Sequence, residues 1–179
     1  MSSPVESVAI ISLEQLREHL NITDTGEDTE LQRFLDAASL AVEDYTGQIW
    51  TRRTVVDEVF VTGGVTYLRP PVVSVESVTS LDEATELTMP SAVDGFTGAV
   101  SGLDDGWSRI TSIAGPVEAP AHVQLATAIV AAHLWTTQRP STPSTSGFGG
   151  VEAGTVPGRG YLIPNQAAQL LGGKAPNRP

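Results

Sequence analysis

The chain has 179 residues, of which 40% are hydrophobic and 6% aromatic, and its formal net charge is −11. This size allows one domain with a real core, or one domain with an arm. The acidic balance argues against a protein that grips nucleic acid, because binding phosphate needs lysine and arginine. The absence of cysteine excludes disulfides and thiolate metal sites. No apolar run approaches the ~20 residues of a membrane span, and the N-terminus shows no signal-peptide pattern.

A short helix is predicted over residues 12–20. Ser12 and Gln15 have the spacing of a capping box, in which each side chain accepts a hydrogen bond from the other residue's backbone N–H. Leu13, Leu16 and Leu20 then form one apolar stripe. A helix this short depends on packing for its stability.

A longer helix is predicted over residues 28–46. Asp28, or alternatively Thr25, is expected to cap its start, and Gly47 is expected to end it. Apolar residues recur at steps of three and four, which indicates one buried helical face. That face consists of Leu31, Phe34, Leu35, Ala38, Val42 and Tyr45.

A β insertion is predicted over residues 52–113. The β-branched run 53–61 reads as a strand, and Gly63-Gly64 is expected to turn it into a hairpin with 65–68. After the proline break at Pro70-Pro71, residues 72–79 are expected to form a half-buried strand. Its inward residues would be Val73, Val75 and Val78, and short strands are expected near 85–89 and 107–113.

The third and strongest helix is predicted over residues 120–138, where alanine is frequent. The Gly/Pro-rich segment 140–179 then forms an arm, with a short helix near 164–171. The expected fold class is α+β. It would be mainly a helical bundle with an inserted small antiparallel β-sheet and an extended C-terminal arm, divided into a domain at 1–139 and the arm at 140–179.

No residue pattern indicates catalysis, so we expect no enzyme activity, no cofactor and no metal site. His19, His122 and His133 lack the convergent spacing of metal ligands. The adjacent carboxylates Asp104 and Asp105 precede a glycine and favour a turn over acid–base chemistry. A hydrolase would need such carboxylates held apart across a substrate.

The candidate functional residues are therefore interface residues. Arg52 and Arg53, with Arg69, form a small basic cluster, which reads either as a partner contact or as the solvated start of a strand. Tryptophan is enriched at binding hot spots, although core use is equally open for these residues. The candidate interface set is Trp50, Arg52, Arg53, Trp135, Phe148, Tyr161, Leu162, Ile163, Leu170 and Leu171.

The order of these elements resembles the head–tail connector, or head-to-tail adaptor, family of tailed bacteriophages with long non-contractile tails. The resemblance is carried by residues 12–20, the acidic turn ending near Asp28, and residues 31–47, with their A-x-x-x-V-E-x-Y-T-G ending. The proline-led strand at 68–78 and the helix at 120–139 add to it.

This resemblance implies a virion structural protein at the head–tail junction, made in the cytoplasm of a bacterial host. It would form a homo-oligomeric, twelvefold ring that joins the portal protein to a tail-side connector or stopper protein. Genome DNA would pass through the lumen without specific binding. The segment from Phe148 to Leu171 would then dock on the portal or on a neighbouring adaptor. The alternative is a small monomeric interaction or assembly-accessory module.

Overall fold

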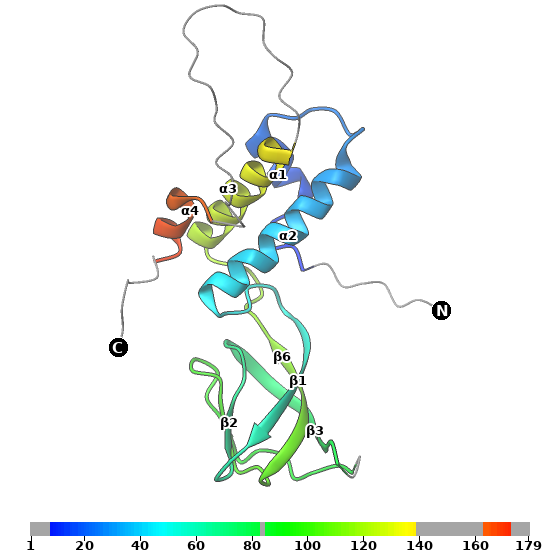
Figure 1. Cartoon of the computed structure of the whole chain (residues 1–179), viewed down its shortest axis with the longest axis vertical. Helices are drawn as coiled ribbons and strands as arrows, with labels where there is room; N and C mark the ends of the chain where they lie inside the picture. The colour runs from blue at the N-terminus through cyan, green and yellow to red at the C-terminus, as the bar shows by residue number, and fades with distance from the viewer. Residues whose placement is uncertain (1–7, 83–84, 139–162, 173–179) are drawn as a thin grey trace, which may run out of the picture.

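The computed structural model describes residues 8–82, 85–138 and 163–172, which form two stacked lobes (Figure 1). The helical lobe contains α1 (Leu13–Leu20), α2 (Asp28–Thr46), α3 (Ala121–Gln138) and α4 (Asn165–Leu170). The β lobe is inserted between α2 and α3. Its strands are β1 (Arg53–Val61), β2 (Val65–Tyr67), β3 (Val72–Ser80), β4 (Ala92–Val93), β5 (Ala99–Ser101) and β6 (Gly106–Ala114).

The start of α1 has the capping box predicted from the sequence. The Ser12 hydroxyl accepts a hydrogen bond from the Gln15 backbone N–H at 3.1 Å, and the Gln15 side chain accepts one from the Ser12 N–H at 2.8 Å. These two bonds satisfy backbone donors that the first turn leaves free. Leu16 on the same helix is fully buried, so packing and capping together stabilise this single short element.

The start of α2 differs from the prediction. Glu27 is the N-cap residue, and no side chain caps the helix there. Asp28 is instead the first helical residue, and its carboxylate lies 3.7 Å from the Arg17 guanidinium at the end of α1. The charge that was expected to cap α2 therefore ties the two helices together. Gly47 ends α2 with a left-handed φ of 70°, a conformation that glycine adopts readily.

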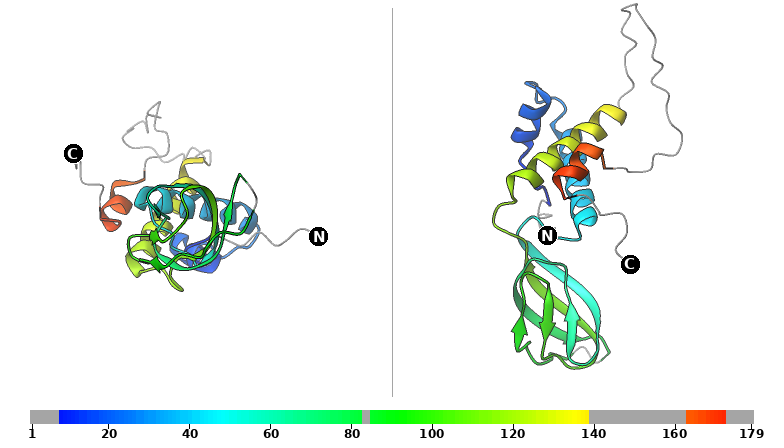
Figure 2. Two further views of the ribbon diagram at one scale, coloured as in Figure 1. Left: turned by 90° about the horizontal axis from the view of Figure 1, so that it is seen from below. Right: turned by 90° about the vertical axis from the view of Figure 1, so that its left-hand side faces the viewer.

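The core of the helical lobe lies between α2 and α3, with α1 and α4 packed around it. Phe34 of α2 and Trp135 of α3 meet edge to face, with ring centroids 5.7 Å apart. The α4 helix lies beside α3 (Figure 2), and its Ala167 is fully buried. The helices thus form a compact cluster whose stability comes from shared apolar surface.

The β lobe consists of two three-stranded antiparallel sheets with strand orders β1-β6-β3 and β2-β5-β4. A second hydrophobic core lies between them. It comprises Val61, Leu68, Val72, Val78, Val100, Leu103 and Ile110, with Val59, Val75 and Leu87 packed against it. Because both sheets contribute to one core, each has an inner face on that core and an outer face turned away from it.

The fold-class prediction of a molecule that is mainly a helical bundle is wrong. The β portion has two sheets and a core of its own, separate from the helical core, so it is a full lobe rather than a small inserted sheet. The sequence pattern underestimated it because the polar stretch 81–106 contains β4 and β5. These two strands are too short to produce a visible alternation.

Several strand predictions need correction. Residues 65–67 do not form a hairpin ladder with β1 beyond the single Thr62–Val65 bridge, and β2 pairs with β5. Val73 is exposed, because irregularities in the pairing of β3 with β6 interrupt the alternation of its side chains. The segment expected as a strand at 85–89 makes only the Thr79–Glu86 bridge.

Candidate interaction surfaces

The joint between the lobes is fixed by a buried ion pair. Glu43 near the end of α2 accepts hydrogen bonds from the Arg53 guanidinium at 2.9 and 2.6 Å. The same carboxylate accepts a bond from the Trp50 backbone N–H at 2.8 Å. Only 1% of the Glu43 side chain and 15% of the Arg53 side chain are exposed. Such a two-point contact fixes both the distance and the orientation of α2 relative to β1.

The returning chain strengthens the joint at Gly115. Its N–H donates to the Pro71 carbonyl at 2.9 Å, and its own carbonyl accepts a bond from the Arg52 side chain at 3.2 Å. A Cβ at this glycine would lie 2.3 Å from the Thr51 carbonyl oxygen, and φ is +89°. The two connecting segments therefore approach so closely that only glycine fits between them.

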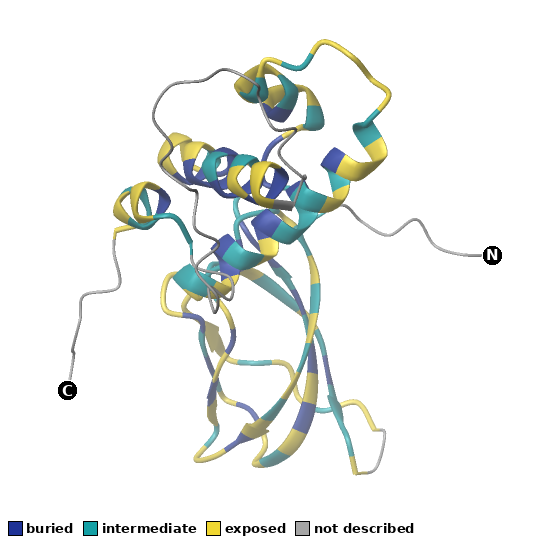
Figure 3. Cartoon of the chain, turned by 45° about the horizontal axis from the view of Figure 1, so that its top comes forward, coloured by how far each residue is buried: buried dark blue, intermediate teal, exposed yellow. Residues whose placement is uncertain are grey.

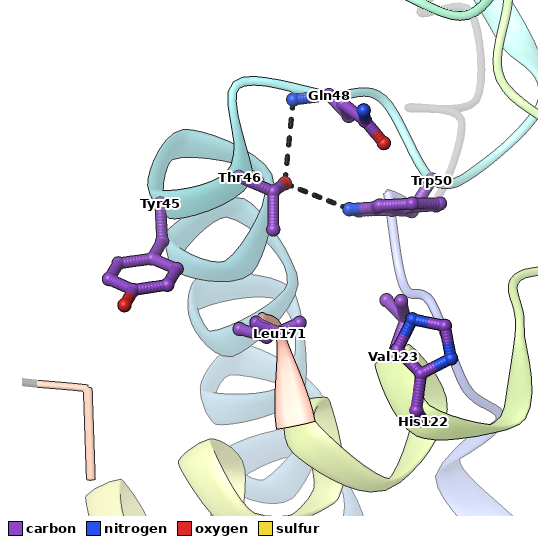
Figure 4. A pocket seen from close by; sticks show the side chains of 7 residues that line it. All are labelled: Tyr45, Thr46, Gln48, Trp50, His122, Val123 and Leu171. Carbon is purple, nitrogen blue, oxygen red and sulfur yellow. Dashed lines mark hydrogen bonds between the residues drawn. The ribbon is translucent and has the colours of Figure 1, made fainter. Parts of the chain in front are cut away.

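An open hollow of about 350 Å³ lies on the helical side of the joint (Figure 4). The Trp50 indole N–H donates to the Thr46 hydroxyl at 2.9 Å, which holds the ring over the end of α2. Tyr45, Thr46, Gln48, Trp50, His122, Val123 and Leu171 line it.

The outer face of the β1-β6-β3 sheet carries an aromatic pair. Phe60 of β1 lies directly opposite Trp107 of β6, with ring centroids 5.5 Å apart, and both side chains are more than half exposed. One step along the same face, the Glu58 carboxylate accepts a hydrogen bond from the Arg109 guanidinium at 2.7 Å. Val56 lies beyond it and is 57% exposed. Figure 3 shows how exposed and buried positions alternate along these strands.

The other sheet presents its own aromatic residues. Tyr67 of β2 is 70% exposed, and Phe96 in the turn between β4 and β5 is 86% exposed. The Asp94 carboxylate accepts bonds from the Phe96 N–H at 3.0 Å and from the Thr97 hydroxyl at 2.6 Å. These two bonds hold the pKa of Asp94 below its usual value. The turn is anchored to the start of β3, where the Val72 N–H donates to the Gly95 carbonyl.

The structure places the predicted interface residues in three kinds of position. Trp135 lies in the helical core and Arg53 pairs with Glu43, so both are used within the chain. Trp50 is half-buried at the joint, and Arg52 is exposed beside it. Three residues of the arm, Ile163, Leu170 and Leu171, pack partly against the helical lobe. The remaining three, Phe148, Tyr161 and Leu162, lie outside the described residues.

Sequence reasoning missed the exposed aromatic residues of the β lobe. Phe60 lies in a run where apolar residues occupy both faces of the strand, so alternation alone does not separate an inner from an outer side. Phe96 lies in a Gly-flanked turn, a setting in which a large apolar side chain is unusual. The placement of a phenylalanine in such a turn was the sequence feature that could have predicted an exposed aromatic side chain.

Among the described residues, no group of three or more His, Asp or Glu side chains lies close enough to hold a metal ion. Asp105, one of the paired carboxylates, accepts a hydrogen bond from the Gly64 N–H at 2.8 Å, which is turn chemistry. None of the described helices has both the length and the hydropathy that a membrane crossing requires.

Two comparisons with known proteins found similarities, one to a family model and one to solved structures. Residues 10–71 match the model of the Phage gp6-like head-tail connector protein family. This match spans α1, α2, β1 and β2, and it confirms the resemblance seen in the sequence. No curated protein sequence matches the chain.

Solved structures extend the likeness to the whole fold. A chain in the neck of a native gene transfer agent (GTA) particle, computed with C12 symmetry, superposes with a TM-score of 0.65 at 16% identity, covering 96% of this chain and 91% of that one. A chain in the neck of an empty GTA particle, computed with C6 symmetry, gives 0.64 at 18% identity, covering 81% and 87%. A chain in the virion of the native gene transfer agent gives 0.64 at 16% identity, covering 96% and 91%. At these identities the likeness establishes the fold.

Proposed function

We propose that the protein is a structural head-to-tail adaptor of a tailed phage or phage-like particle. It forms a homo-oligomeric, twelvefold ring that joins the portal protein to a tail-side connector or stopper protein. Genome DNA passes through the lumen of this ring. The protein is made in the cytoplasm of the bacterial host and works at the head–tail junction of the virion.

One observation carries this proposal: a fold shared over 96% of the chain with a component of a neck computed with C12 symmetry. The family match over residues 10–71 supports it independently, because it rests on sequence rather than on shape. Together they favour a connector over a monomeric accessory module.

The architecture suits a ring component whose two lobes keep one relative orientation. The buried Glu43–Arg53 pair and the close backbone approach at Gly115 hold the two lobes in one orientation. A fixed orientation lets many copies repeat the same contacts, which closed symmetry requires. The net charge of −11 supports DNA passage, because a negative wall repels phosphate and discourages sticking.

The half-buried Trp50 and the exposed Arg52 make the joint a proposed contact site for the portal or the tail-side protein. A tryptophan held in place by one hydrogen bond loses little conformational freedom on binding, which favours its use as an anchor. The C-terminal arm is the second proposed contact. In the free chain its last helix, α4, is already docked on the helical lobe of the same chain.

Cryo-electron microscopy of intact particles at the head–tail junction tests the proposal, with mass spectrometry to identify the chain. Density for this fold in a ring directly beneath the portal is the expected result. If the particles lack the chain, the adaptor proposal is rejected, and the monomeric accessory module becomes the favoured function.

A further inference from the structure

One long edge of the β lobe has no neighbouring strand within the described part of the chain. The strand β1 lies at one side of the β1-β6-β3 sheet, so it pairs with β6 along one edge only. Just beyond its end, Thr62 and Val65 exchange two backbone hydrogen bonds. The chain then leaves β1, because β2 pairs with β5. We define the β1 edge as the backbone N–H and C=O groups of β1 that face away from β6.

Backbone groups alternate in direction along a strand, and this alternation identifies the groups of the β1 edge. The Trp107 carbonyl of β6 accepts a hydrogen bond from the Leu81 N–H and therefore faces the β3 side. Phe60 lies opposite Trp107, so its own backbone groups face away from β6. Every second residue of β1 does the same. These residues are Thr54, Val56, Glu58 and Phe60, and no described residue forms a hydrogen bond with their backbone groups.

The other long edge of the same sheet is protected. β3 has two irregularities in its pairing, its Val72 N–H donates to the Gly95 carbonyl, and its Val78 carbonyl accepts a bond from the Leu87 N–H. β1 has none of these features, since its pairing is regular over 9 residues and it contains no proline or lysine. Proteins usually interrupt or cover a long edge, because its unpaired backbone groups attract other strands. A regular, open edge therefore indicates a strand that another chain supplies.

Exposed apolar side chains adjoin the β1 edge. Val56 and Phe60 are 57% and 56% exposed on the outer face of the sheet, where the Phe60 ring meets that of Trp107. A strand added beside β1 would place alternate side chains next to these, because paired residues share a face. Main-chain bonds would then give affinity and the side chains specificity, as in β-augmentation. The occupant is therefore an extended segment with apolar residues at alternate positions.

Charge identifies the source of that segment. Residues 53–114 contain nine carboxylates and three arginines. Two of these arginines pair with α2, and the third, Arg109, pairs with Glu58. A segment with lysine or arginine complements this acidic lobe. A second copy of the chain does not, since two β1 edges paired about their centre would set Asp57 against Asp57, and like charges opposite each other destabilise a strand pair.

We infer that the β1 edge binds an extended, basic segment of a different protein of the particle, which joins the β1-β6-β3 sheet as an additional strand. Apolar side chains of that segment lie beside Val56 and Phe60, and a lysine or arginine lies beside Asp57. This inference rests on the proposed function, which places other proteins next to the chain. It adds to that function a contact surface and the chemistry of the partner.

The ring density that tests the proposed function also tests this inference. The expected map has a strand of a different polypeptide about 4.8 Å from β1, with a lysine or arginine next to Asp57. A ring that contains the chain but leaves the β1 edge open overturns the inference and leaves the proposed function intact. A strand from another copy of this chain at that edge also overturns it. Particles that lack the chain reject the proposed function and this inference together.

Two variants of one residue isolate the contribution of the backbone. Val56→Pro removes an N–H that faces away from β6, a position at which an edge strand tolerates proline. Val56→Ala is the matched control, because it shortens the same side chain but keeps the N–H. Circular dichroism and thermal unfolding first compare the two purified chains. Quantitative mass spectrometry then measures how much of each variant purified particles contain.

The expected result is that both variants fold and that particles contain about tenfold less Val56→Pro than Val56→Ala, because a carbonyl of the partner loses its donor. Equal incorporation of the two folded variants overturns the inference. If Val56→Pro does not fold, the density at the β1 edge of the natural chain decides by the outcomes given above.

Discussion

The guanidinium of Arg53 and the carboxylate of Glu43 form two hydrogen bonds, at 2.9 and 2.6 Å, across the boundary between two hydrophobic cores. The pair joins the last turns of one helix to the first residue of a strand. Glu43 also accepts a hydrogen bond from the Trp50 backbone N–H. A single carboxylate therefore fixes both the segment that follows α2 and the start of β1.

Removing the charge of Glu43 should therefore destabilise the protein. The Glu43→Gln variant leaves a mostly buried guanidinium without its counter-charge, and breaking a buried pair in this way costs about 3–5 kcal/mol. Urea unfolding of both proteins measures the difference. The matched control is Glu58→Gln, which breaks the exposed pair with Arg109 and should cost less than about 1 kcal/mol. Equal losses in the two variants would contradict a structural role for the buried pair.

The close approach at Gly115 predicts a second effect on stability. In Gly115→Ala the new methyl group meets the Thr51 carbonyl oxygen, and the backbone is also held at a φ of +89°. Gly47→Ala is the control, since its φ is +70° but no atom lies within 4 Å of the added carbon. The control should lose about 1–2 kcal/mol from backbone strain. Thermal unfolding should show a clearly larger loss of stability for Gly115→Ala than for Gly47→Ala. A similar loss of stability in the two variants would mean that the backbone around Gly115 moves to accommodate the methyl group.

The β lobe should contribute a pH dependence through Asp57. Burial raises the pKa of this carboxyl above its ordinary value of 3.8, and Arg69 opposes the shift. Below 3.8 both the folded and unfolded states hold the proton. As the pH rises from there through the folded pKa, the folded state keeps a proton that the unfolded state has lost, so stability falls. Asp57→Asn should therefore gain stability relative to the natural chain as the pH rises above about 4.

Asp94 provides the control of opposite sign. Its pKa is lowered by the bonds from Thr97 and Phe96, so its contribution to stability is present above 3.8 and is lost as the pH falls through the folded pKa. Asp94→Asn should be less stable than the natural chain at neutral pH, and the gap should shrink in acid. Urea unfolding at a series of pH values measures both variants, and parallel curves for the two would contradict these assignments.

Truncation tests whether α4 belongs to the helical lobe. A chain ending at Gln138 loses the fully buried Ala167 and the partly buried Ile163, Leu170 and Leu171 from the core. We expect it to be less stable by about 2 kcal/mol, because burying one large aliphatic side chain contributes about 1.5–3 kcal/mol. A chain ending at Gly172 keeps all these contacts and should match the full chain. Equal thermal stability of the two truncated chains would show that α4 docks elsewhere.

Local signals in the sequence predicted the helices well. The Ser12–Gln15 spacing identified the start of α1, and the left-handed Gly47 identified the end of α2. Both features depend on residues only a few positions apart, so the chain's own pattern contains them. The start of α2 was missed because Asp28 serves a contact with Arg17 of another helix, which no local rule reveals.

The pairing of strands that are far apart in the sequence could not be predicted from the sequence pattern. Gly63-Gly64 predicted a turn, but nothing near it indicates that β2 continues against β5 rather than β1. Val73 was placed inward because strict alternation assumes a regular strand, and the pairing irregularities of β3 break that assumption. The aromatic faces were missed for a related reason. A strand that is apolar on both sides hides its outer surface from any two-residue periodicity.

The insertion points of the β lobe have a consequence for how such chains can change. Arg53 and Ala114, the first residue of β1 and the last of β6, are paired neighbours in one sheet, so their Cα atoms lie only about 5 Å apart. The segment between them, residues 54–113, therefore begins and ends at nearly the same place in the structure. A short turn at that place would let α2 and α3 stay where they are. The β lobe is thus a replaceable cassette, and its outer faces can be exchanged without redesigning the helices above it.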